Sequence, residues 1–297
     1  MSEGPRRLPS PPSASALAWV CEKVGAAGII ASEPLIGGIS HSNHAITLDL
    51  PDRRRVVLRR WVPGWQDQDP DFTVEREAAA LTLLERASFA APRLIAADSR
   101  GERCEAPALL MSYLSGRHPI RSSIPSARFL EQLATTALSL HRISEPWPGI
   151  PRYRPYNELR DPRPPERTRC PDLWHQAFTR AANTRPADRE VFIHRDYHPG
   201  NTLWLRGRLT GVVDWTTASR GPAGVDLGHM RWNLVLSHGE QVAGEFLRKY
   251  CALHGERFDH DPYWDLRTLV DLLPDDGLTD GDLARLEPYL RRVLAQC

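Results

Sequence analysis

The sequence has little net charge, few cysteines and no long apolar run. Lysine and arginine almost balance aspartate and glutamate, leaving a formal net charge of +1, so no overall field favours a nucleic acid or a membrane surface as partner. The five cysteines are scattered and include no CxxC pair, which is typical of reduced thiols. No stretch reaches the ~20 apolar residues of a membrane helix, and the N-terminus lacks the apolar core of a signal peptide. These absences predict a cytoplasmic protein.

What the chain does contain is enough apolar material for two hydrophobic cores. It has 297 residues, of which 41% are hydrophobic, and this suffices to bury more than one core. The 26 prolines gather in the N-terminal tail and between residues 146 and 171. That clustering predicts local loops rather than a disordered chain.

Three acceptor side chains lie close together in residues 191–215. Asp196 follows a His-Arg pair, Asn201 comes five residues later, and Asp214 closes the predicted strand pair that follows. The string His-Arg-Asp-x-x-x-x-Asn is the pattern of a kinase catalytic loop. Phosphoryl transfer needs positioning and charge neutralisation, and Mg²⁺ takes oxygen ligands, one or two of them carboxylates. We therefore predict that Asp196 accepts the proton of an attacking hydroxyl and that Asn201 and Asp214 hold magnesium.

The residues between these acceptors predict how the side chains meet. A Pro-Gly pair lets the loop turn tightly, so that Asn201 points back toward Asp196. Two short strands joined at Gly207-Arg208 are predicted over residues 202–206 and 209–213. The competing interpretation is a zinc pair of His194 and His198, but no further ligand lies at a recognisable spacing.

Two strings carry a family resemblance: HRDYHPGN and GVVDWTTASRGPAGVDLGH. They resemble the aminoglycoside phosphotransferase and choline kinase-like family of small-molecule kinases, most strongly over residues 193–229. The resemblance implies an α+β, two-lobed protein-kinase-like fold. Its small first lobe would hold an antiparallel sheet and one main helix, and its larger second lobe would be mostly helical. We expect a flexible tail over residues 1–12, the first lobe over 13–112 and the second over 113–297.

A glycine hairpin is predicted near the start of the first lobe. Gly37 and Gly38 separate two apolar runs between residues 35 and 50, which indicates strand, turn and strand. Glycine lets backbone amides approach phosphates closely, although most such hairpins are only turns. The resemblance implies a phosphate-covering loop, in which the small polar residues would be Ser40, Ser42 and Asn43.

The next two elements offer a cation and an acid. Residues 55–61 are predicted as a strand, and Arg59 stands where the resemblance implies a phosphate-binding lysine. Arginine keeps the charge but is bulkier than lysine, and a surface arginine is the alternative. The helix predicted over residues 71–87 carries Glu77, which the family would pair with this cation. Glu75 competes for that role, and the helix dipole could explain both acids.

Strands over residues 92–97 and 108–111 would complete the sheet. Residues 111–116 then resemble the family's hinge, where adenine-type bases bind through backbone groups. We therefore expect Met111 and Tyr113 beside the nucleotide, and the choice between ATP and GTP stays open.

The second lobe is predicted to be mainly helical. His141, near the end of a helix over residues 126–143, is interpreted as structural. Gly221-Pro222 is predicted as a turn, and the chain as helical from Gly228 onward. Asp226 either caps that helix or supports the catalytic loop. The other predicted helices cover residues 172–182, 240–253 and 283–295.

Two charged stretches have alternative interpretations. Residues 144–169, rich in Pro, Arg and Tyr, could bind an anion or a nucleic acid, but a solvated loop suits the nearly neutral chain better. Near the C-terminus, the resemblance suggests an acidic surface for a polycationic substrate. Caps and helix dipoles explain the same acids equally well; they are Asp259, Asp261, Asp265, Asp271, Asp275, Asp276, Asp280 and Asp282.

The sequence predicts a magnesium-dependent kinase that moves the γ-phosphate of ATP or GTP to a hydroxyl of a small molecule. The acceptor would be an antibiotic such as an aminoglycoside or macrolide, or a metabolite such as an amino alcohol or sugar. No activation loop of protein-kinase length separates Asp214 from Gly221, which argues against a protein substrate. A catalytically idle nucleotide-binding protein and a nucleic-acid-binding module are the rival hypotheses. Neither the acceptor-binding residues nor the oligomeric state is predicted.

Overall fold

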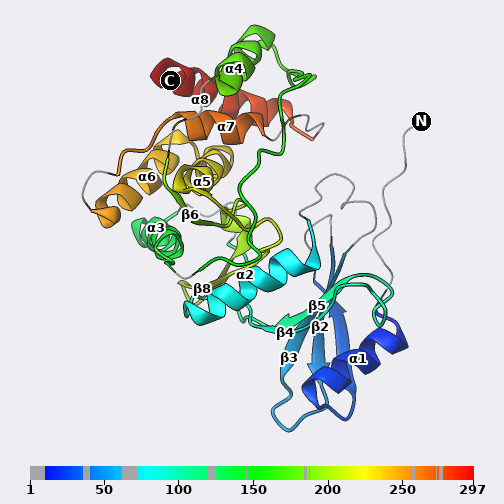
Figure 1. Ribbon diagram of the computed structural model, residues 1–297. Coiled ribbons are helices and arrows are strands. Elements are labelled where there is room, and N and C mark those ends of the chain that lie inside the picture. Colours follow the sequence, from blue (N-terminus) through cyan, green and yellow to red (C-terminus); the bar gives the residue numbers. More distant parts are fainter. Residues whose placement is uncertain are drawn as a thin grey trace. The chain divides into compact units, whose positions relative to one another are not determined.

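The computed structural model describes residues 11–35, 41–61, 72–119, 125–144, 146–183, 186, 188–255, 258–271, 273 and 277–297. The described residues divide into two compact units (Figure 1). The first comprises those of Met1–Ser115, Pro148–Ile150 and Gly211–Thr217. The second comprises those of Gly116–Trp147, Pro151–Thr210 and Ala218–Cys297.

The first unit is built on a five-stranded antiparallel sheet with the strand order β1-β2-β3-β5-β4. The strands are β1 (Ile29–Pro34), β2 (His41–Leu48), β3 (Arg55–Trp61), β4 (Leu94–Asp98) and β5 (Ala108–Ser112). Helix α1 (Ala14–Val24) packs on this sheet, as Figure 1 shows. Its buried Trp19 shares a core with Ile46 of β2 and Leu58 of β3. Alternation along β3 therefore leaves Arg59 on the opposite face of the sheet from this core.

Side chains cap the two helices of this unit at their N-termini. The Ser13 side chain accepts from the amide of Ala16 at the start of α1, and Thr73 accepts from the amide of Arg76 at the start of α2 (Val74–Arg86). Such caps satisfy amides that have no partner inside the helix. Helix α2 contacts β4 and β5 and buries Leu81 among its apolar residues.

The second unit is mostly helical. Its helices are α3 (Ala127–His141), α4 (Pro171–Asn183), α5 (Ala223–His238), α6 (Glu240–His254), α7 (Tyr263–Val270) and α8 (Asp280–Gln296). Strand β6 (Glu190–Ile193) pairs antiparallel with β9 (Ser219–Pro222). Strand β7 (Thr202–Leu205) pairs with β8 (Arg208–Val212) after the short 3-10 helix Pro199–Asn201.

Close packing of α5 against α7 fixes the central helix of this unit. Gly224 and Gly228 lie one turn apart and both face Trp264, which is 1% exposed. A Cβ on Gly228 would lie 2.6 Å from the carbonyl oxygen of Trp264, closer than any real Cβ contact. Only glycine permits this approach, so these two positions fix where α5 packs against α7.

Several boundaries differ from the sequence-based predictions. The strand expected around Leu35 is β1 and ends at Pro34; the glycine turn lies outside the described residues. The turn between β7 and β8 is Arg206-Gly207, not Gly207-Arg208, because both residues have the positive φ that a tight two-residue hairpin requires (49° and 73°).

The prediction of a turn at Gly221-Pro222 was also wrong. Both residues belong to β9, where proline is tolerated at the strand end and Gly221 makes room for the Tyr153 side chain. Helix α5 consequently begins at Ala223, directly after that strand, and not at Gly228. Over the described parts of the chain, no helix is both long and apolar enough to cross a membrane.

Candidate active site

The backbone of the catalytic loop is held by Asp226 of α5. This aspartate is fully buried, and its two carboxylate oxygens accept from the amides of His194 (2.9 Å) and Arg195 (2.7 Å). Nε2 of His141 lies 3.0 Å from the same carboxylate, and Nδ1 of that ring lies 2.8 Å from the Tyr250 hydroxyl. The support role of Asp226 and the structural role of His141 are therefore confirmed. Asp226 is not a cap, because α5 begins three residues before it.

The loop after His194 has a backbone conformation that needs support. Arg195 has φ 72°, which non-glycine residues rarely adopt. Its guanidinium stacks 3.7 Å from the ring centroid of Tyr156, and Tyr153 is buried close by. Both tyrosines come from the Pro-, Arg- and Tyr-rich stretch predicted as a solvated loop, so part of that stretch instead supports the catalytic loop.

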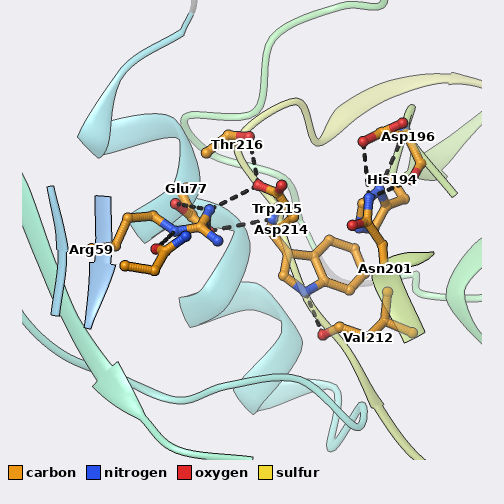
Figure 2. A network of polar contacts seen from close by, with 10 residues as sticks. Arg59, Glu77, His194, Asp196, Asn201, Val212, Asp214, Trp215 and Thr216 are labelled. Atoms are coloured by element: carbon orange, nitrogen blue, oxygen red, sulfur yellow. Dashed lines mark hydrogen bonds and ion pairs between the residues drawn. The ribbon is translucent and has the colours of Figure 1, made fainter. Parts of the chain in front are cut away.

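Asp196 and Asn201 face each other across the short 3-10 turn, as predicted (Figure 2). Nδ2 of Asn201 donates to the backbone oxygen of Asp196 and to its Oδ2, each at 2.9 Å. Both donors of the amide are thus directed at Asp196. Its carbonyl oxygen, Oδ1, accepts no hydrogen bond from any residue that the structure describes.

Two histidines also approach the Asp196 carboxylate. Nε2 of His229 lies 2.8 Å from Oδ1, and Nε2 of His198 lies 3.7 Å from the same oxygen. Burial alone would raise the pKa of Asp196, but His198 and His229 outweigh it and hold the pKa well below its usual range. Asp196 is therefore ionised at neutral pH, as a proton acceptor must be.

Asp214 belongs to the first unit, where it lies in a buried charge network with Arg59 and Glu77 (Figure 2). Nη1 of Arg59 donates to Oδ1 of Asp214 at 2.8 Å and to both carboxylate oxygens of Glu77 at 2.9 and 3.1 Å. Nε of the same guanidinium donates to Oδ1 of Asn43 at 3.0 Å. The alternative of a surface arginine is wrong, because Arg59 is 7% exposed. Glu75 is exposed, so Glu77 is the paired acid.

The segment around Asp214 is fixed by helix α2. Glu77 accepts from the amide of Trp215 at 3.3 Å, and the buried Arg76 donates to the carbonyl of Thr217 at 2.6 Å. Asp214 has φ 70°, a second strained position, and its carboxylate accepts from the Thr216 hydroxyl at 3.0 Å. Sequence reasoning found Asp214 and Glu77 but not Arg76, and it assigned Asn43 to the phosphate-covering loop and not to Arg59.

Burial sets the protonation of Glu77. Desolvation raises the pKa of its carboxyl to about 7, against the opposing effect of Arg59, and the carboxylate of Asp214 adds to the rise. The buried guanidinium of Arg59 thus contacts two carboxyl groups, those of Glu77 and Asp214. Because Asp214 keeps 29% of its side chain exposed, the negative charge that a cation can reach lies on Asp214.

Asn201 of the second unit and Asp214 of the first each carry an oxygen of the kind that Mg²⁺ takes from proteins. The amide oxygen of Asn201 accepts no hydrogen bond from the described residues, and the Asp214 carboxylate is partly exposed. In the described part of the chain no group of three or more His, Cys, Asp or Glu could hold a metal. The zinc interpretation also fails locally, because Nδ1 of His194 and of His198 each accept a backbone amide of the loop.

The remaining predicted nucleotide residues have mixed outcomes. Gly37, Gly38 and Ser40 lie outside the described residues. Met111 is buried in β5 opposite Val57, and Tyr113 lies under the Arg55 guanidinium, 4.1 Å from the ring centroid. Their role at the nucleotide stays a prediction.

Most of the C-terminal acids have partners inside the second unit. Asp265 is buried against Arg231 and His260, and Asp271 accepts from the Tyr153 hydroxyl at 3.1 Å. Asp282 completes the capping box of α8. Asp275 and Asp276 lie outside the described residues, and Asp259 is exposed. Caps and internal ion pairs thus account for much of the acidic stretch.

The fold and the loop geometry together define a phosphotransferase of the small-molecule kinase type. The sequence profile of the phosphotransferase enzyme family (APH) matches residues 33–264, and the chain belongs to this family. Its fold is the two-lobed, protein-kinase-like α+β fold that the sequence predicts. A sequence search of curated proteins finds no significant match.

Three solved structures show the same fold. The ternary complex of a thermostable mutant of aminoglycoside phosphotransferase APH(4)-Ia with AMP-PNP and hygromycin B has a TM-score of 0.63 and 18% identity, covering 96% of this chain and 99% of that one. The GDP complex of aminoglycoside 2'-phosphotransferase-IIIa has a TM-score of 0.63 and 18% identity, covering 94% and 97%. Macrolide 2'-phosphotransferase MphH from Brachybacterium faecium has a TM-score of 0.58 and 19% identity, covering 94% and 95%.

Proposed function

We propose that the protein transfers the γ-phosphate of a magnesium-bound ATP or GTP to a hydroxyl group of a small molecule. The observation that carries the proposal is the orientation of Asn201. Its side-chain NH₂ group donates both of its hydrogen bonds to Asp196. This leaves an ionised carboxylate for the acceptor hydroxyl and a neutral oxygen for a cation on adjacent side chains.

Each proposed role follows from the contacts of the residue. Asp196 accepts the proton of the acceptor hydroxyl, and Asn201 and Asp214 are the magnesium ligands. When bound, magnesium neutralises the charge that develops on the phosphates. Arg59 binds phosphate oxygens with the part of its guanidinium that Glu77, Asp214 and Asn43 do not use.

The nucleotide is proposed to bind at the first lobe, through the Gly37-Gly38 turn with Ser40 and through the hinge at Met111 and Tyr113. The neighbours with solved structures include an AMP-PNP complex and a GDP complex, which supports a nucleoside triphosphate donor without choosing its base. We therefore include both ATP and GTP in the assay.

The proposed acceptors are antibiotics of the aminoglycoside and macrolide classes. The support is the likeness to an enzyme bound to hygromycin B and to a macrolide phosphotransferase. Amino alcohols and sugars are the next acceptors to test, because the fold does not fix the substrate.

The test is phosphoryl transfer with Mg-ATP and Mg-GTP across a panel of aminoglycosides, macrolides, amino alcohols and sugars. We expect acceptor-dependent turnover that Asp196→Asn lowers by about a thousandfold, within the range for loss of a general base. The exposed Asp172 in the first turn of α4 provides the control, Asp172→Asn, which should leave the rate unchanged. Equal turnover by wild type and Asp196→Asn would contradict the proposed role, and turnover that survives magnesium removal would contradict the metal.

A further inference from the structure

A side chain of α5 is directed at the proposed proton acceptor. Nε2 of His229 lies 2.8 Å from Oδ1 of Asp196, the shortest distance at which either nearby histidine approaches that carboxylate. The His229 side chain is 10% exposed, whereas that of Asp196 is 34% exposed. His229 therefore holds the carboxylate from its covered side, and the open side remains for an acceptor.

The direction of this hydrogen bond follows from the chemistry of the two groups. A carboxylate oxygen can only accept, so the proton must lie on Nε2 of His229. On the other oxygen, Oδ2, the amide of Asn201 donates at 2.9 Å. With one donor on each oxygen, the carboxylate plane of Asp196 is fixed. Of about four lone-pair positions on a carboxylate, the others stay available for the acceptor hydroxyl.

His198 is placed for a different task. Its Nδ1 accepts the amide of Gly200 at 3.1 Å, a cap that shapes the 3-10 turn before Asn201. Its Nε2 is 3.7 Å from Asp196, which is beyond a hydrogen bond. The two rings lie 5.7 Å apart, and of the two only His229 comes within hydrogen-bond distance of the Asp196 carboxylate.

The position of His229 is set by the same helix that holds the loop backbone. Asp226 and His229 are three residues apart on α5 and so share a face of the helix. Asp226 fixes the amides before Asp196, and His229 contacts the Asp196 side chain. The Trp232 ring packs on the His229 ring with a centroid distance of 4.9 Å, which restrains the imidazole.

We propose that His229 is a positioning residue for phosphoryl transfer: its Nε2–H fixes the Asp196 carboxylate in the orientation that receives the acceptor proton. The inference rests on the proposed function of Asp196. This role differs from a packing role, because it requires the Nε2–H donor of His229 and not the bulk of the imidazole ring. A misplacement of about 1 Å at a reacting group costs roughly a hundredfold in rate.

Two substitutions separate the donor from the ring. His229→Phe keeps the ring and loses the donor, and His229→Gln loses the ring but places an amide donor at the reach of Nε2. We expect His229→Phe to lower kcat about 10- to 100-fold with the nucleotide KM within about twofold. His229→Gln should recover kcat to within about threefold of wild type. The exposed His175 of α4 supplies the matched control, His175→Phe, with no expected change.

A packing role predicts the opposite order, with His229→Phe active and His229→Gln impaired, and that result would overturn the proposal. Equal losses in both variants would overturn it as well. Thermal unfolding of each variant excludes misfolding as the cause of a lost rate.

An acceptor-independent readout completes the test. Magnesium-nucleotide hydrolysis, in which water replaces the acceptor, is measured for the same variants. Nitrogen NMR of the imidazoles should place the His229 proton on Nε2, and Asp196→Asn should shift that signal. If wild type transfers phosphate but His229→Phe equals it, the positioning role fails and the proposed function stands. If wild type neither transfers nor hydrolyses, the proposed function fails and the inference fails with it.

Discussion

The two units hold their acidic groups in different ways. In the first unit, Asp214 and Glu77 share one guanidinium, and the network is a buried cluster of formal charges. In the second unit, Asp196 faces an amide and imidazoles, while Asp226 accepts backbone amides. Pairing with a guanidinium orders the first group, and hydrogen bonds from amides and imidazoles order the second.

This difference has consequences for robustness. A buried ion pair depends on both partners, because removing one leaves an uncompensated charge in a place without water. A carboxylate that accepts backbone amides fixes the main chain itself, so its loss leaves several buried donors without a partner. We therefore expect the largest stability effect at Asp226 and a pH-dependent effect at Glu77.

Asp226→Ala should give the largest change. Two buried amides lose their acceptor, at about 1–3 kcal/mol each, so the free energy of unfolding should fall by roughly 3 kcal/mol or more. For a protein of this size that corresponds to a Tm lower by about 5–10 °C. The exposed Asp259 offers the control, Asp259→Ala, with no expected shift. A Tm within about 2 °C of wild type would show that Asp226 does not hold the loop.

Glu77→Gln tests the charge cluster through pH. The pKa of Glu77 is about 7 in the folded protein, against an ordinary value of 4.5. Between these two pH values Glu77 is therefore protonated in the folded protein and ionised in the unfolded chain. The Glu77 contribution to the free energy of unfolding therefore falls as pH rises from 4.5 to 7. Glutamine cannot titrate, so the Tm of Glu77→Gln minus that of wild type should increase from pH 5 to pH 8.

Titrating groups that do not interact with Glu77 cancel in that Tm difference, provided that the measurement is made without magnesium. A difference that decreases with pH would mean that the ion pair with Arg59 lowers the pKa of Glu77 instead of burial raising it. The sign of the slope thus decides whether desolvation or charge pairing dominates in the first unit.

The sequence predicted the site residues that a local motif or a family resemblance marks, but not the contacts between residues distant in sequence. Asp196, Asn201 and Asp214 lie in one short stretch with a recognisable spacing, and the family resemblance pointed to Arg59 and Glu77 on the strand and the helix that come earlier in the chain. His229 carries no local signal, because its contact with Asp196 depends on how α5 seats against the loop. Asn43 was considered only for a phosphate loop, since the register that places it beside Arg59 is a property of the paired strands.

The wrong boundaries have the same physical origin. Gly221-Pro222 has the composition of a turn, but the pairing of β9 with β6 and the space required by Tyr153 decide its conformation. Tyr156 likewise lies in a stretch whose composition predicts a solvated loop, yet Arg195 stacks on it. Local composition cannot anticipate a partner that is distant in sequence.

The smallest expected effect is on the nucleotide KM, and it concerns Arg59, which stands where the resemblance implies a lysine. Asn43 is the cross-strand neighbour of Arg59 and accepts from its Nε at 3.0 Å. Removing this one hydrogen bond in Asn43→Ala should raise the nucleotide KM about fivefold, the equivalent of roughly 1 kcal/mol. Arg59→Lys should raise it about tenfold, because one ammonium cannot replace the fork that serves Asn43, Glu77 and Asp214 together.

The double variant Asn43→Ala with Arg59→Lys decides whether Asn43 acts through Arg59. Residues that share one interaction are not additive in a double-mutant cycle. If Asn43 serves only to orient the guanidinium, the nucleotide KM of the double variant should equal that of Arg59→Lys alone. A KM near fiftyfold above wild type, the product of the two single effects, would instead mean that Asn43 contacts the nucleotide itself. In that case the hydrogen bond from Arg59 to Asn43 does not contribute to nucleotide binding through the guanidinium, and the two carboxylates suffice to orient it.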